Sequence, residues 1–249
     1  VTDSTFGISN VNSVTANAGG RYLAVGSAGK AAISDDNAFT WTSVNPQFNQ
    51  SNIYAAAYGD DIFMIGGSSG KIATSSDGEN WTIRNSGFGA SPVLGLSYSS
   101  LASLWVAVGG SGKLATSIDG IEWVLRSSSF GTTYVNKVFS SSDKIIAVGY
   151  DGKLATSTNG TSWTQRTSSF IFSNIYSITA KPSNDLYVAV GDIGKIAVSA
   201  NGLSWSQLFP GSSFGASSIN AVTANDIAFL AGGALGKIAT STSAEQWTQ

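Results

Sequence analysis

Residues 191–205 read GDIGKIAVSANGLSW, a segment that runs from a Gly-x-x-Gly-Lys turn to a tryptophan. Residues 109–123 (GGSGKLATSIDGIEW) and 149–163 (GYDGKLATSTNGTSW) have the same pattern. Self-similarity at a fixed period is the signature of a repeat architecture, and it outranks every other feature in deciding the fold.

The pattern extends along the chain with a period of about 40 residues. Six tryptophans mark it: Trp41, Trp81, Trp123, Trp163, Trp205 and Trp247. A Gly-Lys pair marks the same period: Lys30, Lys71, Lys113, Lys153, Lys195 and Lys237. The chain therefore contains six copies of one unit.

Each copy predicts four short strands, A to D, separated by turn signals. In the fifth copy these are residues 174–179, 186–190, 195–199 and the segment from Trp205 onward. We expect the turn glycines to supply positive φ in a tight B–C hairpin. No segment has sustained helical periodicity, so almost no helix is expected. Four-stranded units in six copies predict an all-β protein, a six-bladed β-propeller of four-stranded antiparallel blades. A β-solenoid is the main alternative, but its coils are usually shorter.

The positions of the two ends predict how the ring closes. Trp247 lies two residues from the C-terminus, so the last strand D is cut short. Residues 2–7 resemble residues 126–131, which follow an internal tryptophan. We therefore expect N- and C-terminal segments to close the ring in the last blade, which removes open sheet edges. We expect residues 1–249 to form a single domain, and the missing initiator Met to reflect a processed chain or an excised fragment.

The composition excludes several kinds of chemistry. There is no His and no Cys, so the commonest general base, the commonest transition-metal ligand and thiolate chemistry are absent. Charged residues make up 11% and the net charge is −2, which predicts no nucleic-acid partner. No apolar run is long enough to span a bilayer, so no membrane insertion is expected. We expect no cofactor and no resident metal, with a calcium site of Asp and carbonyl oxygens left as an alternative.

The segment between strands C and D resembles a known motif. Residues 34–41 (SDDNAFTW) and 75–81 (SSDGENW) are similar to the Asp-box, roughly Ser-x-Asp-x-Gly-x-Thr-Trp, of the BNR-repeat, sialidase-like propellers. The repeat also resembles the photosystem II assembly factor propellers. The resemblance implies the propeller fold. Physically, the short Asp or Asn side chain is expected to accept hydrogen bonds from turn amides rather than to catalyse a reaction.

Enzyme chemistry is not expected. Sialidases hold a carboxylate with three arginines, whereas Arg84, Arg126 and Arg166 occupy one repeat-equivalent position and so lie on separate blades. No carboxylate pair suggests a glycosidase. The Gly-x-x-Gly-Lys turn lacks the spacing and the following helix of a phosphate loop. We expect its lysines to lie over neighbouring apolar surface, with an anion-binding ring as an alternative.

Binding is expected on the face that carries the D–A and B–C connections. The D–A connections are rich in hydroxyls and contain a phenylalanine, as in residues 127–131 (SSSFG), which we expect to fill the space between blades. The B–C turns differ between copies, so their polar residues are the better binding candidates. The candidate ligand-binding residues are Tyr150, Asp151, Asp192, Ser68, Ser69, Ser111, Ser128 and Ser129.

These features predict a non-catalytic recognition module, lectin-like, that binds a glycan or a surface protein. Its expected location is extracellular or on a virion or cell surface. The alternative is a structural or assembly protein whose propeller face contacts other proteins, including a place in a larger assembly. Low charge and hydroxyl-rich turns favour the first hypothesis, and the assembly-factor resemblance favours the second.

Overall fold

The computed structural model describes residues 5–183, 186–208 and 213–249. Within these ranges there is no α-helix, and the only helical segments are six three-residue 3₁₀ turns. The strands form antiparallel sheets in two compact units, Val1–Arg126 and Ser127–Gln249. Each unit holds three sheets, one for each sequence repeat.

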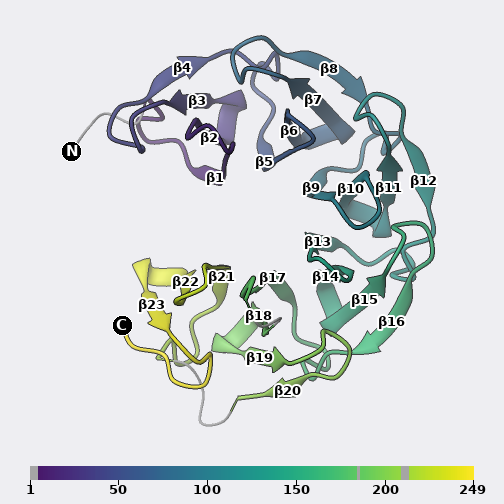
Figure 1. Ribbon diagram of the computed structural model, residues 1–249, viewed down its shortest axis with the longest axis vertical. Coiled ribbons are helices and arrows are strands. Elements are labelled where there is room, and N and C mark those ends of the chain that lie inside the picture. The colour runs from purple at the N-terminus through teal and green to yellow at the C-terminus, as the bar shows by residue number, and fades with distance from the viewer. Residues whose placement is uncertain (1–4, 184–185, 209–212) are drawn as a thin grey trace. The chain divides into compact units, whose positions relative to one another are not determined.

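Unit 1 contains three four-stranded blades. Their strands are β1 (Val11–Ala16), β2 (Tyr22–Gly26), β3 (Ala31–Ser34) and β4 (Thr42–Val44); β5 (Ile53–Gly59), β6 (Ile62–Gly67), β7 (Lys71–Ser75) and β8 (Thr82–Asn85); β9 (Val93–Ser99), β10 (Leu104–Gly109), β11 (Leu114–Ser117) and β12 (Val124–Arg126). Within this unit the first strands β1, β5 and β9 lie side by side at the inner edge, and β4, β8 and β12 lie at the outer edge (Figure 1).

Unit 2 contains the other three blades. Their strands are β13 (Val135–Ser140), β14 (Ile145–Gly149), β15 (Lys153–Ser157) and β16 (Thr164–Thr167); β17 (Ile175–Ala180), β18 (Tyr187–Gly191), β19 (Ile196–Ser199) and β20 (Ser206–Gln207); β21 (Ile219–Ala224), β22 (Phe229–Gly233) and β23 (Ile238–Ser241). The sixth sheet has three strands, and a bridge between Thr240 and Thr248 stands in the fourth position.

The predicted fold class is therefore confirmed: the chain is a six-bladed β-propeller of antiparallel blades. The predicted closure by residues 2–7 falls partly on residues 1–4, which lie outside the described residues, and it stays a prediction. Ser212, one of the hydroxyl residues expected in the D–A connection before Phe214, also lies outside the described residues.

The core lies between neighbouring blades. In the first five blades the second strand is covered on both faces, so it is apolar at successive positions, and in β14 Ile145, Ile146, Ala147 and Val148 are all fully buried. In the sixth blade β22 is only partly covered. One cluster in unit 2 joins Val148 and Leu154 of blade 4 to Ile178 and Tyr187 of blade 5. Burial of β-branched and aromatic side chains on both faces explains why strands were the predicted element.

The B–C hairpins are type I′ turns, and their two glycines have different roles. The second glycine has φ between 63 and 70° in all six copies, as Gly194 does, and this part of the prediction is correct. The first glycine was also expected to use positive φ, and that expectation is wrong. Gly191 is extended, with φ −172°. A Cβ at Gly191 would lie 1.9 Å from the Asn174 carbonyl oxygen and 3.0 Å from Phe170 Cε1. The first glycine is needed for close approach.

The phenylalanine of each D–A connection is buried, as expected. All six, Phe6, Phe48, Phe88, Phe130, Phe170 and Phe214, are at most 2% exposed. The lysine of each repeat helps to hold the connection that carries this phenylalanine. Its ammonium group donates to the phenylalanine carbonyl oxygen in five copies, for example from Lys237 to Phe214 at 2.8 Å. The lysines therefore stabilise the framework by hydrogen bonding, in addition to the expected cover of apolar surface, as where Lys71 Nζ lies 5.9 Å from the Phe48 ring centroid.

Candidate functional site

The C–D turns have the geometry of a self-contained hydrogen-bonded turn. Asp77 Oδ1 accepts the backbone N–H groups of Glu79 and Asn80, each at 2.8 Å, and Ser75 Oγ donates to the same oxygen at 2.8 Å. Asn80 hydrogen bonds hold the pKa of Asp77 well below its usual range. Asn159 makes the equivalent bonds to Thr161 and Ser162. These side chains hold turns together, in agreement with the structural role predicted for them.

The repeat tryptophans complete these turns. Each indole N–H donates to the carbonyl oxygen three residues earlier, at 2.9–3.3 Å, as from Trp163 to Gly160. The indole N–H is thereby satisfied within its own turn.

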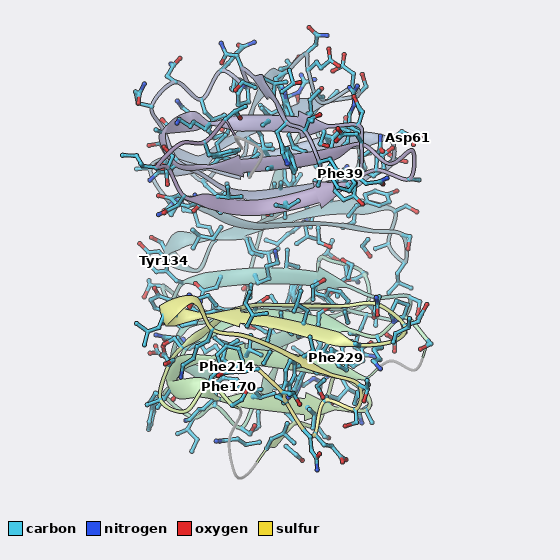
Figure 2. The ribbon with its side chains drawn as sticks, turned by 90° about the vertical axis from the view of Figure 1, so that its left-hand side faces the viewer. Phe39, Asp61, Tyr134, Phe170, Phe214 and Phe229 are labelled. Carbon is cyan, nitrogen blue, oxygen red and sulfur yellow. The ribbon has the colours of Figure 1, made fainter. Side chains whose placement is uncertain are left out.

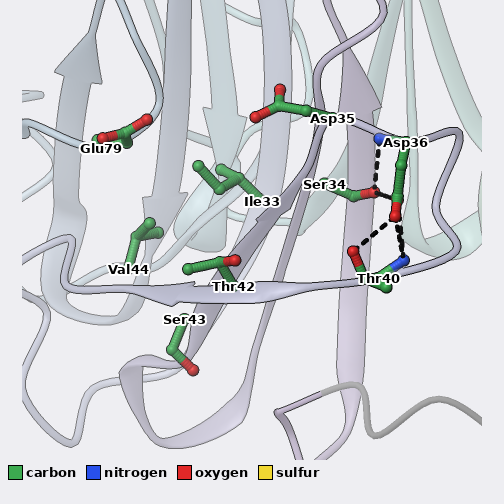
Figure 3. Close-up of a pocket in the computed structure, with 9 residues that line it drawn as sticks. All are labelled: Ile33, Ser34, Asp35, Asp36, Thr40, Thr42, Ser43, Val44 and Glu79. Atoms are coloured by element: carbon green, nitrogen blue, oxygen red, sulfur yellow. Dashed lines mark hydrogen bonds between the residues drawn. The ribbon is translucent and has the colours of Figure 1, made fainter.

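The longest C–D turn borders a cavity of about 530 Å³ in unit 1 (Figure 3). Asp36 accepts Thr40 Oγ1 at 2.6 Å and Ser34 Oγ at 2.8 Å, and these bonds lower the pKa of Asp36 to about 2. Two other carboxylates that line the cavity pair with Arg21: both oxygens of Asp35 at 2.6 and 2.7 Å, and Glu79 Oε1 at 2.8 Å. The charges of this cavity are thus used to tie blade 1 to blade 2.

The repeat-equivalent arginines do not converge. Arg84, Arg126 and Arg166 each donate from Nε to a Thr Oγ1 on the neighbouring strand of their own blade, at 3.0 Å. The arginine triad that a sialidase-like site would need is therefore not assembled by these side chains.

The B–C end of unit 2 gathers aromatic side chains. Tyr134 and Tyr150 stack with ring centroids 5.4 Å apart and an interplanar angle of 22°, and both are about two-fifths exposed. Figure 2 shows Tyr134 at one end of unit 2, while Phe229 lies toward the other end. Tyr150 was predicted from the sequence, whereas Tyr134 was not, because the repeat pattern does not show which side chains stack.

A chain of hydrogen bonds links blade 4 to blade 5 at this end of unit 2. The Asp151 N–H donates to Asn174 Oδ1 at 3.2 Å, and the Asn174 N–H donates to Asp192 Oδ2 at 2.9 Å. Tyr176 donates its hydroxyl to Asp192 Oδ1 at 2.6 Å. Burial and this bond raise the pKa of Tyr176. Three predicted residues, Tyr150, Asp151 and Asp192, are thus brought into one cluster with Asn174 and Tyr176.

A shallow cavity of about 330 Å³ borders this cluster, between Asp151 and Ile171. Ser169 also lines the cavity, and its hydroxyl has no hydrogen-bond partner within the described ranges. Lys153 and Arg166 line it too, but Lys153 Nζ donates to Phe130 O and Thr133 Oγ1. The carboxylate of Asp151 makes no ion pair in the part of the chain that the structure describes.

The predicted serines are distributed differently. Ser68 Oγ lies 3.3 Å from the Tyr54 hydroxyl, and Ser69 is exposed at the tip of the same turn of unit 1. Ser111 is exposed and its hydroxyl contacts Ser91 Oγ at 3.2 Å.

The two serines before Phe130 hold their own turn. Ser128 is buried and accepts the Phe130 N–H at 3.2 Å, so it presents no surface to a ligand. The hydroxyl of the exposed Ser129 donates to the Ser128 carbonyl at 2.6 Å.

Among the described residues, no group of three or more acidic side chains is placed to hold a metal ion. No helix in those ranges is long and apolar enough to cross a membrane.

Fold and site together define a propeller whose repeated polar residues stabilise the framework and whose variable turns form the exposed cluster. No protein-family model matches the sequence, and no curated protein is detectably similar to it.

Solved structures are similar at low sequence identity. YCF48 from Cyanidioschyzon merolae matches with a TM-score of 0.72 and 15% identity, over 96% of this chain and 84% of that one. A structure described as YCF48 bound to D1 peptide matches with a TM-score of 0.73 and 14% identity, over 97% and 80% of the two chains. Virginiamycin B lyase from Staphylococcus aureus matches with a TM-score of 0.81 and 13% identity, over 94% and 82%. These similarities establish the fold, and the predicted resemblance to assembly-factor propellers holds at that level.

Proposed function

We propose that this chain is a non-catalytic propeller that binds another protein, and that the binding surface is the turn face of unit 2. By this name we mean the B–C turns 150–152, 192–194 and 234–236 with the D–A connections 132–134 and 171–174. The observation that carries the proposal is the cluster of Tyr134, Tyr150 and Tyr176 with Asp151 and Asp192. Half-exposed tyrosines beside satisfied polar groups are typical of protein interfaces, where they provide large contact area with little loss of side-chain freedom.

Two further facts support a protein partner over a glycan. One structural neighbour is described as bound to a peptide, which fits the assembly alternative that the repeat suggested. The turn face also carries large exposed apolar side chains, and such patches favour protein contacts over sugar hydroxyls.

The finer predictions complete the proposal. The second candidate function is lectin-like glycan binding. It would use the hydroxyl-rich B–C turns of unit 1, which contain Ser68, Ser69 and Ser111. We also propose that the six C–D turns are Asp-box turns, supported by the Asp77 hydrogen bonds, and that the protein acts outside the cell or on a virion or cell surface. One structural neighbour is named a lyase. In this chain Asp36 and Asp77 accept hydrogen bonds within their own turns, which supports a structural role for these carboxylates over a catalytic one.

Site-specific photo-crosslinking tests the proposal. A benzophenone amino acid replaces exposed Tyr150 in one variant and exposed Phe39, on a C–D turn of unit 1, in a matched control. Figure 2 labels Phe39 among the unit 1 side chains. We expect a discrete protein adduct from position 150 and none from position 39. Binding to a glycan array together with no adduct at position 150 would contradict a protein partner and favour the lectin candidate.

A further inference from the structure

Three bulky apolar residues of the turn face have a backbone conformation that such residues rarely adopt. Ile171, Ile193 and Leu235 have φ of 58, 56 and 61°, in the left-handed region. This region crowds Cβ against the backbone, and a β-branched or bulky residue there is a genuine outlier.

The other repeats serve as internal controls for these positions. In the other five copies the position of Ile171 is occupied by glycine four times and by asparagine once: Gly7, Asn49, Gly89, Gly131 and Gly215. The position of Ile193 and Leu235 is small or polar in the other four copies: Ala28, Ser69, Ser111 and Asp151. The fold therefore does not require a large side chain at either position, and all three exceptions are in unit 2.

Packing does not explain the exceptions. The side chains of Ile171, Ile193 and Leu235 are 69, 61 and 88% exposed, and the adjacent Phe172 is 88% exposed. Neither the strained backbone nor the exposed apolar side chains of these residues stabilise the fold. Strain of this kind concentrates at functional sites, where another requirement maintains it.

The charges of this face are one-sided. Among the described residues, Asp151 is exposed and makes no ion pair, and the Asp192 carboxylate accepts the Asn174 N–H and the Tyr176 hydroxyl. The lysines beneath these turns, such as Lys195, direct their ammonium groups inward to Phe170 O and Ser173 Oγ. Arg166 also borders the shallow cavity, where its Nε donates to Thr156 Oγ1. Within the turns that define the face, the outward-facing charges are the carboxylates of Asp151 and Asp192, beside tyrosine rings that also attract cations.

We propose that the turn face of unit 2 binds a protein segment in which apolar side chains alternate with Lys or Arg. The apolar side chains contact Ile171, Ile193 and Leu235, and a cationic group pairs with the exposed carboxylate of Asp151. This inference rests on the proposed function and specifies the chemistry of the partner.

Substitutions that suit a positive φ separate binding from folding. The triple variant Ile171→Gly, Ile193→Asn and Leu235→Asn places residues favoured at positive φ in the same turns. We expect it to unfold at a higher temperature than the parent chain and to bind at least about tenfold more weakly. The matched control, Ser69→Asn with Ser111→Asn, changes the same turn in unit 1 and should leave binding unchanged.

The charge is tested separately. Asp151→Asn retains an Asn-Gly pair, which suits the type I′ turn, while removing the negative charge. Affinity for a cationic segment should fall about threefold, as for an exposed ion pair, and binding should become less sensitive to salt.

The probes are short labelled peptides in which leucine alternates with arginine, glutamate or serine, measured by fluorescence anisotropy against the full chain. The inference requires that the arginine peptide binds best and that the triple variant loses this binding. Tighter binding of the glutamate peptide, equal binding by the triple variant, or no binding of the arginine peptide overturns it. In those cases a protein adduct at position 150 would show that the proposed function survives, and its absence would show that both fail.

Discussion

Lys153 Nζ donates a hydrogen bond to the carbonyl oxygen of Phe130 at 2.8 Å, across a turn in which the phenylalanine ring is 1% exposed. A second bond joins the same ammonium group to Thr133 Oγ1 at 2.8 Å. Because five repeats share the lysine–phenylalanine bond, it is a recurring part of the framework.

Lys153→Met should therefore destabilise the chain. Loss of a charged donor leaves the Phe130 carbonyl without this partner, and we expect a cost of about 1.5–3 kcal/mol in the free energy of unfolding. Urea denaturation measures it. An unchanged transition would show that the bond is dispensable.

Lys137 on β13 provides a contrasting case. It is half-buried, makes no hydrogen bond or ion pair within the described ranges, and burial lowers its pKa. A lysine with a lowered folded-state pKa opposes folding when it is charged, and this penalty fades as the pH rises through that pKa toward the unfolded value. Lys137→Met should be neutral or stabilising at neutral pH, with the gain shrinking in alkaline solution. A destabilised Lys137→Met variant would mean that the ammonium group has a structural partner.

The two glycine roles can be distinguished by alanine substitution. Gly191→Ala puts a methyl group 1.9 Å from the Asn174 oxygen, and we expect it to cost about 3 kcal/mol or more. Gly215→Ala has no atom within 4 Å of the new Cβ and has φ +60°, so only the left-handed penalty of about 1–2 kcal/mol applies. Equal costs in thermal or chemical unfolding would contradict the close-approach explanation.

Acid should weaken the C–D turns. The pKa values of Asp36 and Asp77 are lowered by hydrogen bonds in the folded state, so the carboxylates contribute stability above the ordinary carboxyl pKa of about 4. This contribution is lost as the pH falls through the folded-state values, beginning below about pH 4. In the Asp77→Asn variant the unfolding midpoint should fall less steeply as the pH is lowered below about 4. The turn should still form, since Asn159 makes the same turn with an amide oxygen. An unaltered acid limb would show that Asp77 does not contribute.

The sequence predicted the fold well because the determinants of the propeller recur. The tryptophan, the turn glycines and the lysine repeat six times, and each has a local hydrogen-bonding or packing reason that the structure confirms. The role of the first glycine was misassigned. A repeated glycine indicates that a side chain is not tolerated, but the sequence does not show whether a positive φ or a nearby carbonyl oxygen is the reason.

The site was predicted only in part. Tyr150, Asp151 and Asp192 were visible as departures from the repeat, whereas Tyr134 and Tyr176 became meaningful only through a stacked ring and a bond to Asp192. Ile171 is a similar departure, from glycine to isoleucine, and the sequence contained this signal. Its importance depends on the positive φ, which the sequence does not show.

The turn face of unit 2 is proposed as the binding surface. Hydrogen–deuterium exchange of the chain, alone and in complex with the partner that crosslinking identifies, is the decisive test. If the turn face of unit 2 binds the partner, the backbone amides of residues 150–152, 171–174 and 192–194 exchange more slowly in the complex. Slower exchange confined to the C–D turns 77–80 and 119–122, with the turn face unchanged, would contradict it.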